Sequence, residues 1–266
     1  MKNIQKAFNK AKEENRSALI TYICAGDPDM NTTKKLVLEL VKNGADIIEL
    51  GVPFSDPIAD GPTIQRAAQR ALKNNTNLNS ILELVKELKK IISVPIILMG
   101  YYNPFLKAGL KEFSKKAVAN GVDGIIIPDL PPEEAEDWIA AAHSAELDTI
   151  FLLAPTSNED RILKVAKICR GFVYYVSILG VTGARNELPE GISGKISNIK
   201  KHTQLPVGVG FGISSPQQVK QIVSTGADGI IVGSAIISII EKNLEQPDLV
   251  NNVGKFIAEL RTGLSR

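Results

Sequence analysis

Two carboxylic acids, Glu49 and Asp60, are the residues in this sequence best suited to chemistry. Glu49 ends an apolar stretch that is typical of a buried strand, and Asp60 closes the proline- and glycine-rich loop that follows. Burial raises the pKa of a carboxyl group toward the range that suits proton transfer. A single acidic residue is more often paired or solvated, but the stiffened loop at a strand end favours an acid–base pair here.

Two glycine-containing segments suit the binding of an anionic group. Residues 209–216 and 232–235 each follow an apolar stretch and open a helical pattern. Glycines let backbone N–H groups approach an anion, and the N-terminus of a helix favours negative charge. The segments therefore predict a phosphate site; the alternative is that the glycines only permit tight turns.

The elements that must position these residues alternate between short apolar strands and amphipathic helices. The expected strands cover 17–25, 46–50, 94–101, 124–128, 148–154, 172–177, 206–211 and 229–232. The expected helices cover 2–15, 27–43, 62–73, 78–92, 110–119, 133–145, 159–169, 195–202, 216–224, 234–243 and 248–262. A long polar loop at 180–194 is either a lid over the site or a plain surface connection.

Eight strands, each followed by a helix, predict an α/β protein with the (β/α)8 TIM barrel fold, an N-terminal capping helix and extra helices. An internal repeat supports this fold: segments 42–48, 120–127 and 225–232 each contain a glycine, then an aspartate, then a strand. The phosphate-binding glycine motif expected after the first strand of a doubly wound sheet is absent. No linker divides the chain, so we expect one barrel domain, 1–266.

Composition narrows the classes of function. The net charge is +2 with lysines spread along the chain, which indicates neither a nucleic-acid surface nor a basic membrane surface. No lysine or histidine falls at the C-terminal end of a predicted strand, so we expect no Schiff-base chemistry and no metal site. The two cysteines lie in apolar surroundings and the N-terminal segment lacks a secretion signal, so we expect a cytoplasmic protein, or one of the plastid stroma if the source is a plant.

The segment from Glu49 to Gln65 closely resembles the signature of the tryptophan synthase alpha chain family. Motifs beginning at Gly26, Tyr101, Ile127, Gly180 and Gly210 resemble that family in the same order, so that the resemblance covers essentially the whole chain. The family is a (β/α)8 barrel that cleaves indole-3-glycerol phosphate into indole and glyceraldehyde 3-phosphate. Its members work in an αββα complex whose beta chain uses pyridoxal phosphate to join indole to serine.

The resemblance implies a role for each site residue. Glu49 is expected to act as the general acid and base, and Asp60 to stabilise positive charge on the indole nitrogen. An indole pocket is expected from Tyr22, Met99, Tyr101, Ile126, Leu152 and Tyr174. The phosphate is expected at Gly183, Phe211, Gly212, Gly233 and Ser234, with Thr182 on a lid that closes over Asp60. No cofactor is expected in this chain.

The resemblance also implies a beta-chain partner, which Asp56, Asn103, Pro131 and Pro132 are expected to face. Some relatives carry an Arg-Ser pair immediately before the lid motif, where this chain has Ile178 and Leu179. That departure leaves Glu49 and Asp60 untouched. Two alternatives stay open from the sequence: a free-standing lyase that releases indole, and a catalytically silent barrel that binds a phosphorylated ligand.

Overall fold

The computed structural model describes residues 2–176, 191–210 and 212–266. Its strands, in chain order, are β1 Ala18–Cys24, β2 Ile47–Gly51, β3 Ile96–Met99, β4 Gly124–Ile126, β5 Asp148–Ile150, β6 Leu152–Leu153, β7 Val173–Val176, β8 Val207–Gly210 and β9 Gly229–Val232. The first helices are α1 Asn3–Glu13, α2 Met30–Lys42, α3 Pro62–Lys73, α4 Leu78–Leu88, α5 Tyr102–Lys107 and α6 Leu110–Ala119. The others are α7 Glu136–Ser144, α8 Glu159–Ile168, α9 Ile192–His202, α10 Pro216–Val223, α11 Ser234–Lys242 and α12 Leu249–Arg261.

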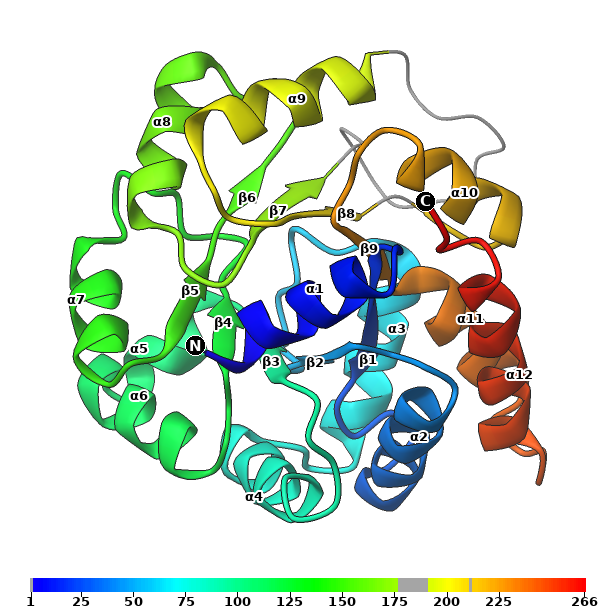
Figure 1. Ribbon diagram of the computed structural model, residues 1–266. Helices are drawn as coiled ribbons and strands as arrows, with labels where there is room; N and C mark the ends of the chain where they lie inside the picture. The colour runs from blue at the N-terminus through cyan, green and yellow to red at the C-terminus, as the bar shows by residue number, and fades with distance from the viewer. Residues whose placement is uncertain (1, 177–190, 211) are drawn as a thin grey trace.

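The strands form one parallel sheet in the order β5-β4-β3-β2-β1-β9-β8-β7-β6, and its two ends meet within a single segment of chain. The predicted strand at 148–154 is divided at Phe151, because its first half pairs with β4 and its second half with β7. That segment closes the ring. The fold is therefore the expected (β/α)8 barrel, with helices around the strands (Figure 1).

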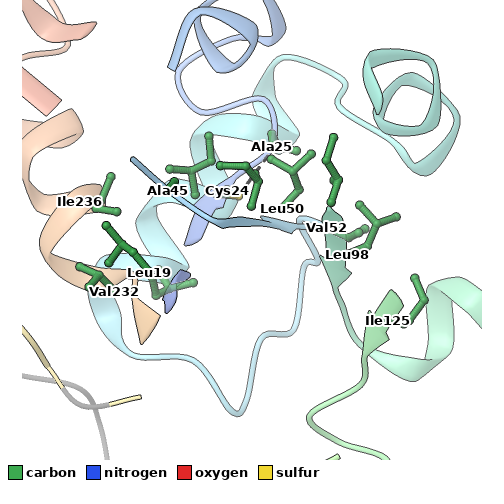
Figure 2. Close-up of a cluster of buried hydrophobic side chains, with 14 of the residues drawn as sticks. Leu19, Cys24, Ala25, Ala45, Leu50, Val52, Leu98, Ile125, Val232 and Ile236 are labelled. Carbon is green, nitrogen blue, oxygen red and sulfur yellow. Dashed lines mark hydrogen bonds between the residues drawn. The ribbon is translucent and has the colours of Figure 1, made fainter. Parts of the chain in front are cut away.

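Alternation along the strands separates two apolar cores. Leu19, Ile48, Leu98 and Ile230 point outward into the layer between sheet and helices. Figure 2 shows part of this layer, where Leu50 of β2 and Leu98 of β3 accompany other buried side chains. The residues that alternate with these along each strand point into the barrel. Both faces of each strand are therefore buried, which explains why the strands are apolar throughout.

Helix α1 covers one end of the barrel, as Figure 1 shows. Its buried residues Ile4, Phe8 and Ala11 recur at the spacing of one helical face. They pack against the inward-facing side chains of the strands, among them Ile20 and Phe172. The predicted capping helix is thus confirmed, and it leaves the opposite end of the barrel for the site.

The internal repeat has a physical basis at the end of the barrel that α1 covers. Its glycines, Gly44, Gly121 and Gly226, all have positive φ values between 87° and 100°, a conformation that ends a helix and that glycine adopts without strain. The aspartate two residues later accepts a hydrogen bond from the backbone of a neighbouring segment. Asp46 Oδ2 lies 2.8 Å from the nitrogen of Leu19, and the repeats at Asp123 and Asp228 do the same for Ile96 and Val207.

The sequence missed helix α5. The predicted strand at 94–101 ends earlier, at Met99, and a six-residue helix begins at Tyr102. Pro104 occupies the first turn of this helix, where its missing N–H has no helical partner to lose. Across the described ranges, no helix is long and apolar enough to cross a membrane.

Candidate active site

Glu49 points into the barrel from the middle of β2. The alternation that sends Ile48 and Leu50 outward directs Glu49 inward. Its side chain is fully buried, and neither carboxyl oxygen has a hydrogen-bond partner among the described residues. Burial, with a smaller contribution from the negative charge of Asp60, raises the pKa of Glu49 to about 8. A buried, unpartnered carboxyl group at the wall of a cavity is available to a ligand.

Asp60 lies in the loop between β2 and α3 and is held from two sides. Its Oδ2 accepts a 3.0 Å hydrogen bond from the hydroxyl group of Tyr101, which in turn accepts one from the backbone nitrogen of Ala59 at 2.9 Å. Its backbone oxygen accepts a 2.9 Å bond from Nε2 of Gln65 in α3. Burial raises the pKa of Asp60, and the bond from Tyr101 opposes that rise. The two carboxyl groups therefore occupy different environments.

A cavity of about 410 Å³ opens at the C-terminal ends of the strands and contains most of the predicted site. The predicted residues that line it are Tyr22, Glu49, Asp60, Met99, Leu152, Tyr174, Gly212, Gly233 and Ser234. Residues that were given no individual role from the sequence complete the wall, several of them within the motifs named above: Ile58, Ala59, Gly61, Ile64, Pro128, Val176, Gly210, Ile213 and Ile231. The mixture of apolar walls with a few polar groups is typical of a site for a small organic ligand.

Tyr22 lies directly beside Glu49, because the two residues are paired in the register of β1 and β2. Its hydroxyl group reaches over Gly51, and a Cβ atom at that position would collide with it. Gly51 is therefore required for a close approach of the tyrosine to the β2 backbone. Nothing in the local pattern of the sequence could have predicted this contact.

Other predicted site residues fall elsewhere. Ile126 is fully buried in the apolar interior of the barrel and does not line the cavity. Tyr101 is also absent from the wall, and its described contacts are the bonds to the Asp60 loop and a stacked ring, Phe54, 5.3 Å away. Thr182, Gly183 and Phe211, together with Ile178 and Leu179, lie outside the described residues.

The two helices expected to bind phosphate differ at their N-termini. Helix α10 is closed by its own capping box, in which Ser215 and Gln218 satisfy each other's backbone groups. Helix α11 begins after Gly233 without a side-chain cap, and Ser234, its first residue, lines the cavity. The N-terminus of α11 is the better candidate for binding an anion, because it has no side-chain cap, adjoins the cavity, and carries the positive end of the helix dipole.

The residues expected to face a partner have different exposures. Asp56 and Asn103 are exposed, Pro131 is half-buried, and Pro132 is buried. Pro132 could not have been distinguished from its neighbour by sequence. Among the described residues, no group of three or more His, Cys, Asp or Glu side chains is arranged to hold a metal ion.

Taken together, the barrel and the cavity define a class: (β/α)8 proteins with a cavity at the C-terminal ends of their strands, lined here by two carboxyl groups and by the first residue of a helix. Comparison with known proteins gives the family. The family model of the tryptophan synthase alpha chain matches residues 8–262. The chain belongs to the tryptophan synthase alpha chain family.

Individual relatives match over nearly their full length. The chain is 50% identical over 264 residues to the tryptophan synthase alpha chain of Geotalea uraniireducens, covering 99% of this chain and 98% of that one. It is 49% identical to that of Geobacter sulfurreducens, covering 99% of each. The crystal structure of tryptophan synthase subunit alpha from Legionella pneumophila superposes with a TM-score of 0.91 at 38% identity, covering 99% of this chain and 98% of that chain.

Proposed function

We propose that this chain is a lyase that cleaves indole-3-glycerol phosphate into indole and glyceraldehyde 3-phosphate. Membership of the family supports the reaction. The observation that carries it is the environment of Glu49: a carboxyl group that is fully buried, has no partner among the described residues, and lies in the wall of a cavity shared with Asp60. Such a group can exchange protons with a ligand at neutral pH.

The proposed step balances within the substrate and Glu49. With a pKa of about 8, Glu49 is largely protonated at neutral pH and donates its proton to C3 of the indole ring. The ring nitrogen then carries positive charge, which the carboxylate of Asp60 stabilises through the N–H group. Glu49 takes back a proton from the hydroxyl group on the adjacent glycerol carbon. The carbon–carbon bond breaks, its electron pair returns to the ring, and the glycerol carbon becomes an aldehyde.

The cavity suggests how the substrate lies. Apolar side chains such as Met99, Leu152 and Tyr174 suit the flat indole ring, and the uncapped N-terminus of α11 at Ser234 suits the phosphate. The glycerol carbons would then cross the cavity next to Glu49. Thr182, Gly183 and Phe211 remain predicted ligands of the substrate on the basis of the resemblance alone.

We also propose that a tryptophan synthase beta chain binds beside the Asp60 loop and receives the indole. Two large apolar side chains are exposed there, Ile58 in the loop (85%) and Leu106 on α5 (51%), near the predicted partner residues Asp56 and Asn103. Exposed apolar side chains are typical of a protein interface. The chain is proposed to need no cofactor itself, with pyridoxal phosphate bound by the beta chain, and to work in the cytoplasm.

The test is indole release from indole-3-glycerol phosphate by the purified chain, alone and with a beta chain. We expect slow cleavage alone and faster cleavage in the complex. Rapid release that a beta chain does not change would favour a free-standing lyase. Binding of the substrate without any cleavage in either sample would favour the silent barrel and contradict the proposal.

A further inference from the structure

Four charged side chains form an ion-pair network, here called the α3–α11 network: Arg66 and Arg70 of α3, Glu241 of α11, and Asp27 of the loop after β1. Helices α3 and α11 lie side by side in Figure 1. Arg66 of α3 donates two hydrogen bonds of 2.7 Å to Glu241 of α11, from Nε to Oε1 and from Nη2 to Oε2. Arg70, one turn further along α3, donates from Nη1 to Oε1 of the same glutamate at 2.9 Å. Arg70 also donates to Asp27, from Nε at 2.6 Å and from Nη2 at 2.9 Å.

The α3–α11 network is stronger than a pair of surface charges. The side chain of Asp27 is fully buried, and those of Arg70 and Glu241 are 19% and 27% exposed. Two of its contacts are bidentate arginine–carboxylate pairs, which fix geometry as well as charge. The hydrogen bond from Arg66 lowers the pKa of Glu241 to about 2, so that the glutamate is ionised at any pH at which the protein works.

Each element that the network joins also carries a part of the cavity. Helix α3 begins two residues after Asp60, and Gln65 in its first turns binds the Asp60 backbone. Helix α11 begins at Ser234. Asp27 lies in the loop after β1, the strand that carries Tyr22. The network therefore connects three supports of the site without contacting the cavity itself.

Helices transmit a displacement along their length because they are stiff. Glu241 is seven residues after Ser234, so the network holds α11 about 10 Å from the end that faces the cavity. If Glu241 lost its charge, Arg66 and Arg70, one turn apart on α3, would repel each other, and Asp27 would be the remaining negative charge of the network. A small tilt of α3 against α11 would then change the distance between Asp60 and Ser234.

We propose that Arg66, Arg70 and Glu241 are positioning residues that set the separation between Asp60 and the anion site at Ser234. The inference rests on the proposed function, in which a single substrate contacts both groups. Its consequence is specific: disturbing the network should weaken ligands that span the cavity, and should not weaken ligands that occupy one end of it.

The experiment compares the full-length chain with its Glu241→Gln variant on three ligands. Glycerol 3-phosphate probes the anion site, indole probes the apolar end, and an indole joined to a phosphate through three carbons spans both. We expect the variant to bind the spanning ligand about tenfold more weakly or worse, because linkage helps only when both ends fit together. Its Kd values for the two short ligands should stay close to those of the wild-type chain.

Turnover provides a second readout. For cleavage of indole-3-glycerol phosphate, kcat of Glu241→Gln should fall by about 10- to 100-fold, as expected for a displacement near 1 Å. The matched control is Glu87→Gln, which removes the 2.7 Å ion pair between Lys34 of α2 and Glu87 of α4, helices that carry no cavity residue. The control should leave spanning-ligand affinity and kcat unchanged.

Three results would overturn the inference: unchanged binding of the spanning ligand, equal weakening of all three ligands, or the same losses in Glu87→Gln. If Glu241→Gln does not fold, Arg66→Gln gives a milder comparison. It removes the two hydrogen bonds between Arg66 and Glu241 but keeps the one from Arg70, so the spanning ligand should again be the one weakened, by a smaller factor. A wild-type chain that binds the spanning ligand but does not cleave the substrate would contradict the proposed function alone. The binding comparison would still decide the inference.

Discussion

The hydroxyl group of Tyr101 donates a 3.0 Å hydrogen bond to Oδ2 of Asp60. This contact distinguishes the two carboxyl groups of the cavity, because Glu49 has no such partner among the described residues. A hydrogen bond to the ionised form favours ionisation, whereas burial alone disfavours it. The structure thus gives one group that tends to be neutral and another that is helped to stay charged.

Tyr101→Phe should therefore lower kcat/KM for cleavage by about 10- to 100-fold, the worth of one hydrogen bond to a charged group. Without the hydroxyl group, burial should raise the pKa of Asp60 further, so that the acidic limb of the pH profile moves to higher pH. Tyr102→Phe is the matched control, since Tyr102 is not among the residues that line the cavity. An acidic limb that stays in place in Tyr101→Phe would contradict this role.

The raised pKa of Glu49 has a consequence for stability. Between its ordinary pKa of 4.5 and about 8, the folded protein holds a proton on Glu49 that the unfolded chain has lost, so this residue makes unfolding easier as pH rises. Glu49→Gln lacks that effect. The free energy of unfolding of the variant, relative to wild type, should rise by about 1.4 kcal/mol per pH unit from pH 6 to 8 and then level off.

Urea unfolding at pH 6, 7, 8 and 9 measures this difference, and other titrating groups largely cancel between the two proteins. A gap between variant and wild type that stays constant with pH would show that Glu49 is not protonated in the folded state.

Substitutions of Ser234 can show whether the phosphate binds at the start of α11. Ser234→Asp places a negative charge at the uncapped start of α11, where it should compete with phosphate for the free N–H groups. The affinity for glycerol 3-phosphate should fall at least tenfold, measured by calorimetry. Ser234→Ala keeps the backbone donors, so its affinity for glycerol 3-phosphate should fall much less. Equal affinities in the two variants would place the phosphate elsewhere.

Asp46 is expected to stabilise the end of the barrel opposite the cavity. It forms two hydrogen bonds with the nearly buried Arg16, at 2.6 and 2.8 Å, and accepts a third from the backbone of Leu19. Asp46→Asn leaves Glu14 as the remaining carboxylate partner of the nearly buried arginine. The free energy of unfolding should fall by about 1–3 kcal/mol, because a buried charge pair is lost. Activity below the melting transition should not change.

Glu112→Gln is the control for that measurement, because its ion pair with Lys115 is exposed and 3.9 Å long. It should shift the free energy of unfolding by less than about 0.5 kcal/mol. If Asp46→Asn were as mild as the control, the contacts of Asp46 with Arg16 and Leu19 would not stabilise this end of the barrel.

The sequence predicted what depends on local pattern. The apolar stretch that ends at Glu49 marked strand β2, and the repeated glycines marked the helix ends before β2, β4 and β9. The sequence alone could not predict contacts between distant segments. The bond from Tyr101 to Asp60 spans 41 residues, and the α3–α11 network joins residues 175 apart. The difference between α10 and α11 as anion sites depends on side-chain capping, which motif spacing does not reveal.

Glu49 is proposed to donate the proton that starts cleavage. The most direct measurement is single-turnover release of indole from indole-3-glycerol phosphate by the wild-type chain and by Glu49→Gln, with circular dichroism to verify folding. We predict a fall of about 10²- to 10⁴-fold in the variant, with wild-type kcat/KM declining as pH rises through about 8. Near-normal release of indole by folded Glu49→Gln would show that Glu49 does not donate this proton.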